Sequence, residues 1–403
     1  MRHVSLIATL ACVSAGSAHA QGALSLQGLG YPAGEISARA EGAGSALADF
    51  DALSVTSPAS MAGVGAPAIY LQYSPEFRRV TTSDGSAKTT TARFPVVIGL
   101  LPMGQSWTLA LSSSTFLDRS LETSVTRNEV IGDITDTVVV TERNRILGAI
   151  NDARLALAWS PSPKFRVGLG AHVFSGSNRI TLSTLYPDTT IFISNAQTGR
   201  ISYAGLAGSA GVELRPVRQI ALAFAARKGG TLRAESNDTT IGEGRIPDHY
   251  SGSITFEGLP GTIIAARLAH DSWSSLTSLS SSGVQAFDGW DGGVGIEASG
   301  PRFLQRLITV RAGARFRTLP FGFSDGATTS ISQECNVAGF CTDVVFRAGS
   351  NRVTERSFAA GLGIPLTRDR AALDVSFERA TRDAGTDVKE RGFILSFGLR
   401  VSP

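Results

Sequence analysis

The sequence predicts an all-β protein, a transmembrane antiparallel β-barrel of about fourteen strands. The first observation is a period of two: from Phe165 to Val173 every second residue is apolar, and the residues between them are small or polar. That period is typical of a β-strand with one apolar face. The second observation is that such segments recur to the C-terminus behind a secretory signal. An exported chain of repeated one-sided strands is typical of the bacterial outer membrane.

Residues 1–20 have the features of a secretory signal peptide. Arg2 and His3 precede an apolar stretch over residues 4–13, and Ala18-His19-Ala20 forms a cleavage site of the small-x-small type. The apolar stretch is too short and wrongly flanked for a membrane anchor. We therefore expect export, with the mature chain beginning after residue 20.

Charge and hydropathy exclude several classes of protein. No run of 18 apolar residues occurs after the signal, which excludes a bundle of membrane helices. The formal net charge of +3 favours no nucleic acid or other polyanion as a partner. The 44 glycines suit strands that are apolar on one side only. Composition alone leaves a large soluble β-protein open.

Two cysteines, Cys335 and Cys341, remain once the signal with Cys12 is removed. An even pair in an exported chain favours a disulfide, and the short spacer can close a small loop. A zinc site is the alternative, but no histidine lies near either cysteine. We expect a structural staple, with no metal and no cofactor.

The alternation continues from residue 66 onward in fourteen segments, and an even number is what closure in the bacterial outer membrane requires. The expected strands are 66–82, 91–101, 106–122, 146–160, 165–182, 198–214, 219–236, 247–258, 262–276, 286–299, 306–321, 353–366, 371–382 and 390–401.

Loop lengths predict the orientation. The connections at 102–105, 161–164, 215–218, 259–261, 300–305 and 367–370 are short, whereas 123–145, 183–197 and 322–352 are long. Short periplasmic turns alternating with long external loops place both termini in the periplasm and the two cysteines outside.

The last strand resembles the terminal signal that the barrel-assembly machinery reads. Glu390-Arg391-Gly392 is followed by Leu395 and Phe397 at alternating positions, although the chain ends in Ser402-Pro403 instead of an aromatic residue. We expect this machinery as a partner during biogenesis, and outer-membrane lipid and lipopolysaccharide as the surroundings of the folded barrel.

The segment between the signal and the first strand carries a set of short motifs in a fixed order. Ser37-Ala38-Arg39-Ala40-Glu41-Gly42-Ala43-Gly44 leads into Ser45-Ala46-Leu47-Ala48-Asp49, and Ser57-Pro58-Ala59 follows. This series resembles the N-terminal signature of the long-chain fatty acid transporter (FadL) superfamily, with Ser57 in place of the usual Asn.

Further matches extend the resemblance over nearly the whole mature chain. Ile246-Pro247-Asp248 opens one strand, and Gly361-Leu362-Gly363-Ile364-Pro365-Leu366 opens the final strands. The last motif is also similar to the secretion-associated PorV branch. The resemblance implies a plug at residues 21–65 inside a barrel at residues 66–403. The plug motif residues are Arg39, Gly42, Gly44, Asp49 and Pro58.

The resemblance also implies a function, namely passive uptake of a hydrophobic small molecule of the fatty acid or hydrocarbon type. Such a molecule leaves through a gap in the wall when the plug shifts, and a wall opens only where strand pairing is interrupted. Ser112, Ser113 and Ser114 are candidates for that gap, because the outward apolar rhythm of Trp107, Leu109 and Leu111 fails there. A strand that has left the membrane is the alternative explanation.

Seven arginines are expected to point into the lumen, with Glu213, Glu257, Asp374 and Glu378 as possible partners. Buried charges must be paired or solvated, which favours a structural network between plug and wall. A substrate carboxylate held by a bidentate contact is the alternative. The candidate ligand-binding residues are Arg311, Arg315 and Arg317 on one strand face, together with Arg267; the other inward arginines are Arg154, Arg166 and Arg227.

Two other classes of function stay open. An enzyme would need a nucleophile such as Ser209 and one of the bases His172, His249 or His270, but the Ser209 motif lies within a strand and lacks the first glycine of a nucleophile elbow. We expect no catalysis. A secretion-associated barrel would instead bind exported proteins through the loops at 123–145 and 322–352.

Overall fold

The computed structural model describes most of the chain from residue 28 onward. The described residues are 19–20, 28–82, 85–130, 137–187, 192–279, 286–303, 306–323, 329–335, 341–347, 351–366, 370–385 and 388–402. No helix among them is long and apolar enough to cross a membrane.

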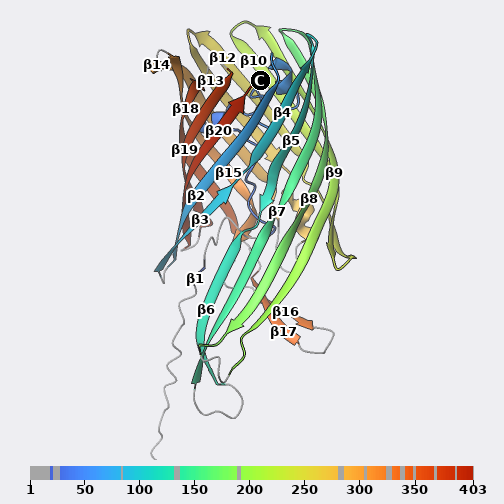
Figure 1. Cartoon of the computed structure of the whole chain (residues 1–403), viewed down its shortest axis with the longest axis vertical. Helices are drawn as coiled ribbons and strands as arrows, with labels where there is room; N and C mark the ends of the chain where they lie inside the picture. Colours follow the sequence, from blue (N-terminus) through green and yellow to red (C-terminus); the bar gives the residue numbers. More distant parts are fainter. Residues whose placement is uncertain are drawn as a thin grey trace, which may run out of the picture.

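The described strands build a closed antiparallel barrel with a wall of 14 strands, as the sequence predicts (Figure 1). Each wall strand pairs with its neighbours along the chain, and β20 pairs with β2, so that Val401 lies opposite Ile69. The wall strands are β2 (Ala68–Thr82), β4 (Val96–Met103), β5 (Trp107–Asp118), β7 (Thr137–Ser162), β8 (Phe165–Leu185), β9 (Asn195–Val217), β10 (Ile220–Ser236), β12 (His249–Leu259), β13 (Thr262–Asp271), β14 (Gly289–Phe303), β15 (Arg306–Phe323), β18 (Asn351–Leu366), β19 (Ala371–Asp383) and β20 (Lys389–Val401).

Strand alternation places apolar side chains on the outside of the barrel and polar ones in the lumen. Leu169 and Leu206 on the outer face are 64% and 65% exposed, whereas the inward Gln72, Glu76 and Arg154 are buried. This arrangement is inverted relative to a soluble protein, because the outer face meets lipid instead of water.

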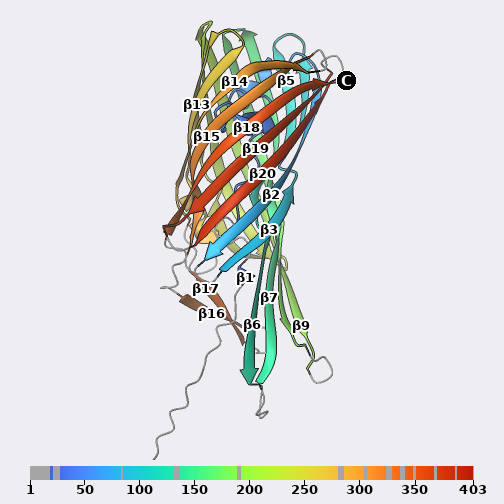
Figure 2. The same ribbon diagram turned by 90° about the vertical axis from the view of Figure 1, so that its left-hand side faces the viewer.

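Several shorter strands lie outside the fourteen, and β7, β8 and β9 are longer than predicted. β7, β8 and β9 run together beyond the rest of the wall, and β6 pairs with β7 (Figures 1 and 2). The stretch 123–145, expected as a loop, is therefore largely a hairpin. In this hairpin β6 and β7 stay paired residue by residue. Thr126 lies opposite Thr141, and the two hydroxyls are 3.1 Å apart. The additional strands are β1 (His19–Ala20), β3 (Gly85–Arg93), β6 (Leu121–Val130), β11 (Thr239–Arg245), β16 (Thr329–Cys335) and β17 (Cys341–Arg347).

The expected disulfide falls where only the backbone is described. β16 and β17 form a separate hairpin in which Cys335 lies opposite Cys341. The residues between the two cysteines, 336–340, lie outside the described part. The disulfide therefore stays a prediction.

Residues 28–65, here named the N-terminal segment, lie inside the ring of strands. The segment holds α1 (Ala38–Gly42) and the 3₁₀ helix η1 (Ala59–Gly63), and most of its residues are buried. Ser37 begins α1, because its hydroxyl accepts a hydrogen bond from the Ala40 backbone N–H at 3.1 Å. The second 3₁₀ helix, η2 (Trp273–Leu279), follows β13 and packs against β11.

Candidate functional site

The N-terminal segment touches the wall backbone-to-backbone, which only glycine allows. Gly44 has φ +62°, and a Cβ there would lie 2.6 Å from the Ala314 backbone nitrogen. On the facing strand, a Cβ on Gly313 would lie 2.3 Å from Ala43. Gly42 likewise meets Gly361, with a Cβ position 2.9 Å from its Cα. A methyl group at any of these contacts would push the segment off the wall.

The other predicted plug motif residues make polar and packing contacts with the wall. Arg39 makes a bidentate contact with Glu297 of β14, at 2.9 and 2.7 Å. Asp49 is buried and accepts hydrogen bonds from Ser253 Oγ at 2.5 Å and from Arg267 Nε at 3.2 Å. Pro58 precedes η1 and packs over Gly168.

All four candidate ligand-binding arginines are ion-paired with carboxylates. Arg311 bridges Glu297 and Asp374, at 2.6 Å each. Arg315 holds both oxygens of Asp291, at 2.8 and 2.6 Å. Arg267 reaches Asp49 and, at 3.4 Å, Asp291. Arg317 pairs with Glu355. Arg267 thus connects the wall to Asp49 of the N-terminal segment, and Arg317 connects it to Tyr31 and Pro32, whereas Arg311 and Arg315 pair within the wall.

A cluster of charges surrounds Tyr31, a residue that the sequence interpretation did not single out. Guanidinium carbons lie 4.6 to 5.7 Å from its ring centre, and its hydroxyl accepts hydrogen bonds from two arginines and donates to Glu355 Oε2 at 3.0 Å. Glu76, Asp118, Glu355 and Glu390 supply the opposite charges. The four arginines are Arg78, Arg93, Arg317 and Arg382.

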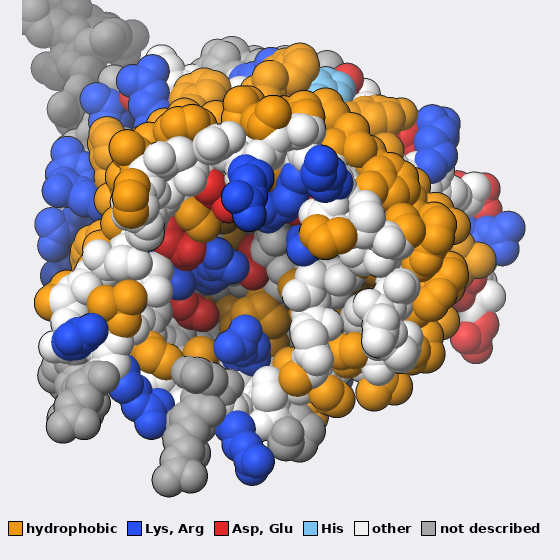
Figure 3. Space-filling view, turned by 90° about the horizontal axis from the view of Figure 1, so that it is seen from above, with side chains coloured by type: hydrophobic (Ala, Val, Ile, Leu, Met, Phe, Trp, Pro, Cys, Tyr) orange, Lys and Arg blue, Asp and Glu red, His pale blue; other side chains and the backbone are white. Residues whose placement is uncertain are grey.

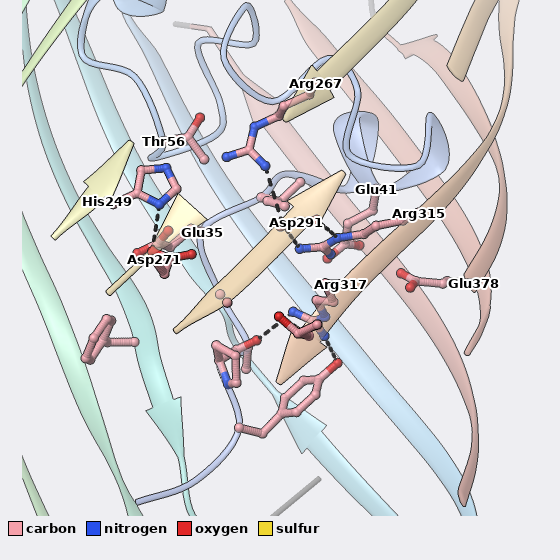
Figure 4. A pocket seen from close by; sticks show the side chains of 18 of the residues that line it. Glu35, Glu41, Thr56, His249, Arg267, Asp271, Asp291, Arg315, Arg317 and Glu378 are labelled. Atoms are coloured by element: carbon pink, nitrogen blue, oxygen red, sulfur yellow. Dashed lines mark hydrogen bonds and ion pairs between the residues drawn. The ribbon is translucent and has the colours of Figure 1, made fainter. Parts of the chain in front are cut away.

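A cavity of about 90 Å³ lies in the lumen between this cluster and α1 (Figure 4). Its polar lining includes Glu35, Glu41 and Asp291, and Phe116 and Trp273 form an apolar side. The rings of Phe116 and Trp273 are stacked at 5.2 Å, and Phe174 meets Phe116 edge-on at 4.8 Å. These aromatic side chains belong to a larger buried apolar cluster on the side of the cavity toward the long loops.

A second cavity, of about 790 Å³, opens at the end of the barrel where the C-terminus lies. Figure 3 shows this end as a hollow with basic and acidic side chains in it. Arg39 and Asp51 of the N-terminal segment line it, together with the wall residues Arg166, Arg311 and Asp374. The segment therefore separates a small, partly aromatic cavity from a wide, charged one.

The wall pairing is interrupted on one side of the barrel. There β4 pairs with β5, but among the described residues β3, which precedes β4, does not pair with β6, which follows β5. β4 and β5 pair up to Val96 opposite Ser114, and the Thr115 N–H then donates to the Pro95 carbonyl at 2.9 Å. Beyond this point, in the described part, β3 pairs only with β2, whereas β6 pairs with β7 and β1. Figure 2 shows the diverging strands. We name this interruption the wall break.

The N-terminal segment covers the inner side of the wall break. Tyr31 and Asp118 exchange backbone hydrogen bonds in both directions, at 2.9 Å each. Gly34 packs against the strand ends, where a Cβ would lie 2.7 Å from the Pro95 oxygen and 2.8 Å from the Thr115 oxygen. The segment thus gives Asp118 of β5 a backbone partner at a position where the described residues of β3 do not pair with β5.

The predicted gap residues lie beside the wall break. Ser112, Ser113 and Ser114 are paired with β4 on one side and with β7 on the other. The signal that marks the break is Pro95, which the sequence interpretation did not use. Proline has no N–H to donate to a ladder, so it belongs at the end or edge of a pairing.

Two candidates for catalysis, Ser209 and His172, form a hydrogen-bonded chain with Asp152 in the lumen. His172 Nδ1 lies 2.8 Å from Asp152 Oδ2, and its Nε2 lies 2.8 Å from Ser209 Oγ. The backbone around Ser209 pairs with β8 on one side and β10 on the other. The other two histidines are apart from this chain, since His249 pairs with Asp271 at 2.7 Å and His270 packs on Trp290.

Comparison with known proteins identifies the fold. No family model matches the sequence, and no curated protein matches it. Among solved structures, the chain is similar to a Pseudomonas aeruginosa FadL homologue, with a TM-score of 0.60 and 13% identity over 94% of this chain and 100% of that one. It is also similar to the Ralstonia pickettii toluene transporter TbuX, with a TM-score of 0.53 and 12% identity over 93% and 99%. The P. putida toluene transporter TodX gives a TM-score of 0.51 and 11% identity over 93% and 99%. The chain therefore has the FadL-like outer-membrane barrel fold.

Proposed function

We propose that this protein lets hydrophobic small molecules, of the fatty acid or hydrocarbon type, cross the outer membrane passively. The observation that carries the proposal is the wall break, which is covered from inside by Tyr31 and Gly34 and lies beside an aromatic cavity. The names of the similar structures, a FadL homologue and two toluene transporters, agree with this function.

The proposed path runs from the long loops to the break. An apolar molecule enters against Phe116, Phe174 and Trp273, where each Å² of apolar surface removed from water contributes about 25 cal/mol. The charged cavity at the far end offers no such gain, because Arg311 and Asp374 there would be desolvated. Lateral exit through the wall break into the lipid avoids that cost.

In this proposal the plug comprises residues 21–65, which include the N-terminal segment, and the barrel spans 66–403. Exit requires the two hydrogen bonds between Tyr31 and Asp118 to open. The short turns and both termini face the periplasm, and the long hairpins of β6 to β9 face outward. The β4–β5 ladder then ends, on the periplasmic side of the opening, at Ser112, Ser113 and Ser114.

The chain of Ser209, His172 and Asp152 is structural in this proposal. An acyl transfer site needs free donors for the oxyanion, and the backbone N–H groups near Ser209 lie within strand ladders. Arg154, which lies opposite His172 in the register, donates to the Val55 carbonyl at 2.7 Å. The hydrogen bonds instead satisfy two buried polar side chains.

A reversible crosslink across the break tests the transport path. We would make Tyr31→Cys/Asp118→Cys in a Cys335→Ser/Cys341→Ser background and measure uptake of labelled oleate and toluene into barrel-containing liposomes. Oxidation is expected to lower uptake at least about tenfold relative to the same protein reduced, since a difference of ~1.4 kcal/mol or more in the opening step corresponds to that factor. The control pair Ile98→Cys/Ser112→Cys joins strands that are already paired, so its uptake is expected to be equal in both states.

Equal uptake by the oxidised and reduced forms of the first pair would rule out the wall break as the exit. Mass spectrometry of molecules extracted from the purified barrel, beside an unrelated barrel, then identifies the substrate class. An exported protein that copurifies in place of a hydrophobic molecule would favour the secretion-associated alternative, for which the hairpins of β6 to β9 offer a surface.

A further inference from the structure

A row of cations crosses the outer face of the barrel near the strand ends that lie toward the long loops. Arg391 of β20 lies opposite Arg79 of β2, and Arg79 lies opposite Lys88 of β3. All three side chains are exposed. Two further exposed arginines flank the row: Arg356 on β18 and Arg379 on β19. We name these five residues the cationic row.

The cationic row lacks acidic partners. None of its members forms an ion pair with a described residue, whereas several other exposed cations do, for example Arg143 with Glu122 and Arg233 with Glu243. Like charges directly opposite one another on neighbouring strands destabilise a sheet. Anions from outside the chain would therefore stabilise these three adjacent cations.

The row lies at the boundary of the apolar outer face. On β20 the outward residues from Val401 to Phe393 are apolar, and Arg391 is the next outward residue. On β2 the outward positions lead similarly from Ile69 to Phe77 and then to Arg79. A cation that follows directly on an apolar band stands at the depth of lipid headgroups.

Aromatic rings lie immediately below the cations. Phe393 is 40% exposed and contacts Phe377 edge-on, with ring centres 4.2 Å apart, and Phe77 lies 6.4 Å from it on the other side. In the register, Phe393 is opposite Arg379. Cationic and aromatic side chains thus alternate over the same strands.

An apolar groove of about 750 Å³ continues from the row along the outer face, across β10, β12 to β15 and β18. Arg356 and Phe358 form its edge next to the row, and Leu268 and Val294 line its floor with the small residues Gly252 and Gly292. The groove has the character of a binding place for an acyl chain, with a guanidinium at one end.

We propose that the cationic row and this groove bind a phosphorylated glycolipid of the outer leaflet, of the lipid A type. Its phosphates accept hydrogen bonds from the guanidiniums of Arg79 and Arg391 and from the Lys88 ammonium. Its acyl chains lie on the phenylalanine rings and in the groove. The site is independent of the transport path, and it rests on the proposed orientation with the long loops outside.

Native mass spectrometry with purified barrel and bisphosphorylated lipid A tests the site. The variant Arg79→Gln/Lys88→Gln/Arg391→Gln is expected to bind about 100-fold more weakly, since each cation near a lipid surface contributes about fivefold. The control Arg143→Gln/Lys228→Gln/Arg233→Gln removes the same charge from exposed cations that have acidic partners, and its affinity is expected to stay within about twofold. Unchanged binding by the first variant would overturn the site.

A gain-of-charge variant keeps the proposal testable if the triple variant folds poorly. Thr381 lies between Arg356 and Arg391 in the register, so Thr381→Lys is expected to tighten binding about fivefold. A variant that binds no more tightly than the wild type would count against the row.

Binding of other lipids and of inorganic phosphate shows whether the site recognises lipid A or any phosphate group. Dephosphorylated lipid A and phosphatidylglycerol are expected to bind at least about tenfold more weakly than bisphosphorylated lipid A, because neither carries two phosphates on one head. Equal binding of phosphatidylglycerol, or displacement of lipid A by millimolar inorganic phosphate, would overturn the glycolipid assignment. Labelling of Lys88→Cys on intact cells by an impermeant maleimide checks the orientation. An unlabelled residue would place the row in the inner leaflet and contradict this inference without affecting the transport assay.

Discussion

Tyr31 and Asp118 form a two-way backbone pair, N–H to oxygen at 2.9 Å in each direction, just beyond the point where β4 and β5 cease to pair. One residue of the N-terminal segment thereby replaces a missing strand neighbour. Because Tyr31 also carries the hydroxyl at the centre of four guanidiniums, the same residue joins the wall break to the buried charge cluster.

Gly34→Ala is expected to open the wall break. The added methyl group would lie within 3 Å of two backbone oxygens, and overpacking of this kind costs about 1–3 kcal/mol. We expect higher ion conductance in planar bilayers and faster uptake of hydrophobic substrate. Gly65→Ala is the matched control in the same segment, because its added methyl group meets nothing within 4 Å. Identical conductance of the two variants would contradict the role of the segment as a cover.

Tyr31→Phe keeps the ring among the guanidiniums but removes the hydroxyl. Glu355, Arg317 and Arg382 each lose one hydrogen bond, and a hydrogen bond to a charged group contributes about 1.5–3 kcal/mol. The melting temperature of the barrel in detergent is expected to fall. Tyr73→Phe, on the exposed outer face, serves as the control and is expected to melt like the wild type.

Arg315→Ala distinguishes a structural arginine from a ligand-binding one. Asp291 would keep only the 3.4 Å contact with Arg267, and breaking a buried ion pair costs about 3–5 kcal/mol. We expect clearly reduced heat resistance with fatty acid uptake largely retained. Loss of carboxylate uptake with normal heat resistance, and with toluene uptake intact, would instead make Arg315 a ligand. The exposed Arg302→Ala is the control for charge loss.

Glu41 makes the docking of the N-terminal segment depend on pH. Burial raises the pKa of Glu41 to about 7, against opposing hydrogen bonds from Ser396 and Ser376. The folded state therefore favours the protonated carboxyl, so stability is expected to rise as the pH falls from about 7 toward the ordinary value of 4.5. Melting temperatures measured between pH 8 and pH 5 check the sign. Glu41→Gln is expected to remove this part of the pH dependence, and an unaltered profile in that variant would exclude Glu41 as its source.

Ser209→Ala tests the structural role of the histidine chain. The variant loses the 2.8 Å contact with His172, which stabilises the fold by about 1 kcal/mol. We expect a slightly lower melting temperature and the same background hydrolysis of a p-nitrophenyl ester as for the wild type. Ester turnover that disappears with Ser209 would show that the barrel is an enzyme.

The wall could be predicted from the sequence because a period of two is local. Alternation from Phe165 to Val173 needs only neighbouring residues to be recognised, and all fourteen wall strands carry such a signal. The predicted ends of the strands are less accurate than their positions in the chain. Residues 123–145 are mostly polar, and their valines at 138–140 fall on both faces, so the pattern does not distinguish a hairpin from a loop and does not predict the ladder of β6 and β7.

The charge cluster could not be predicted, because its members meet from distant parts of the chain. Tyr31 lies 351 residues from Arg382 and 286 from Arg317 in sequence. Alternation indicates that an arginine points inward, but it does not indicate which carboxylate the arginine meets. The wall break does have a local signal in Pro95, which directly precedes Val96, the residue paired with Ser114.

The seam between β20 and β2 has a consequence for how the molecule is put together. The N-terminal segment is continuous with β2, so when the ring closes, with Val401 beside Ile69, the end of the segment that leads into β2 is fixed to the wall. Once the seam has formed, this end of the segment cannot leave the ring. The segment can slide or fold within the lumen, but its other end leaves only through a mouth of the barrel. Closure of the seam therefore tethers the segment at one end, and any movement of the segment out of the lumen passes through a mouth of the barrel.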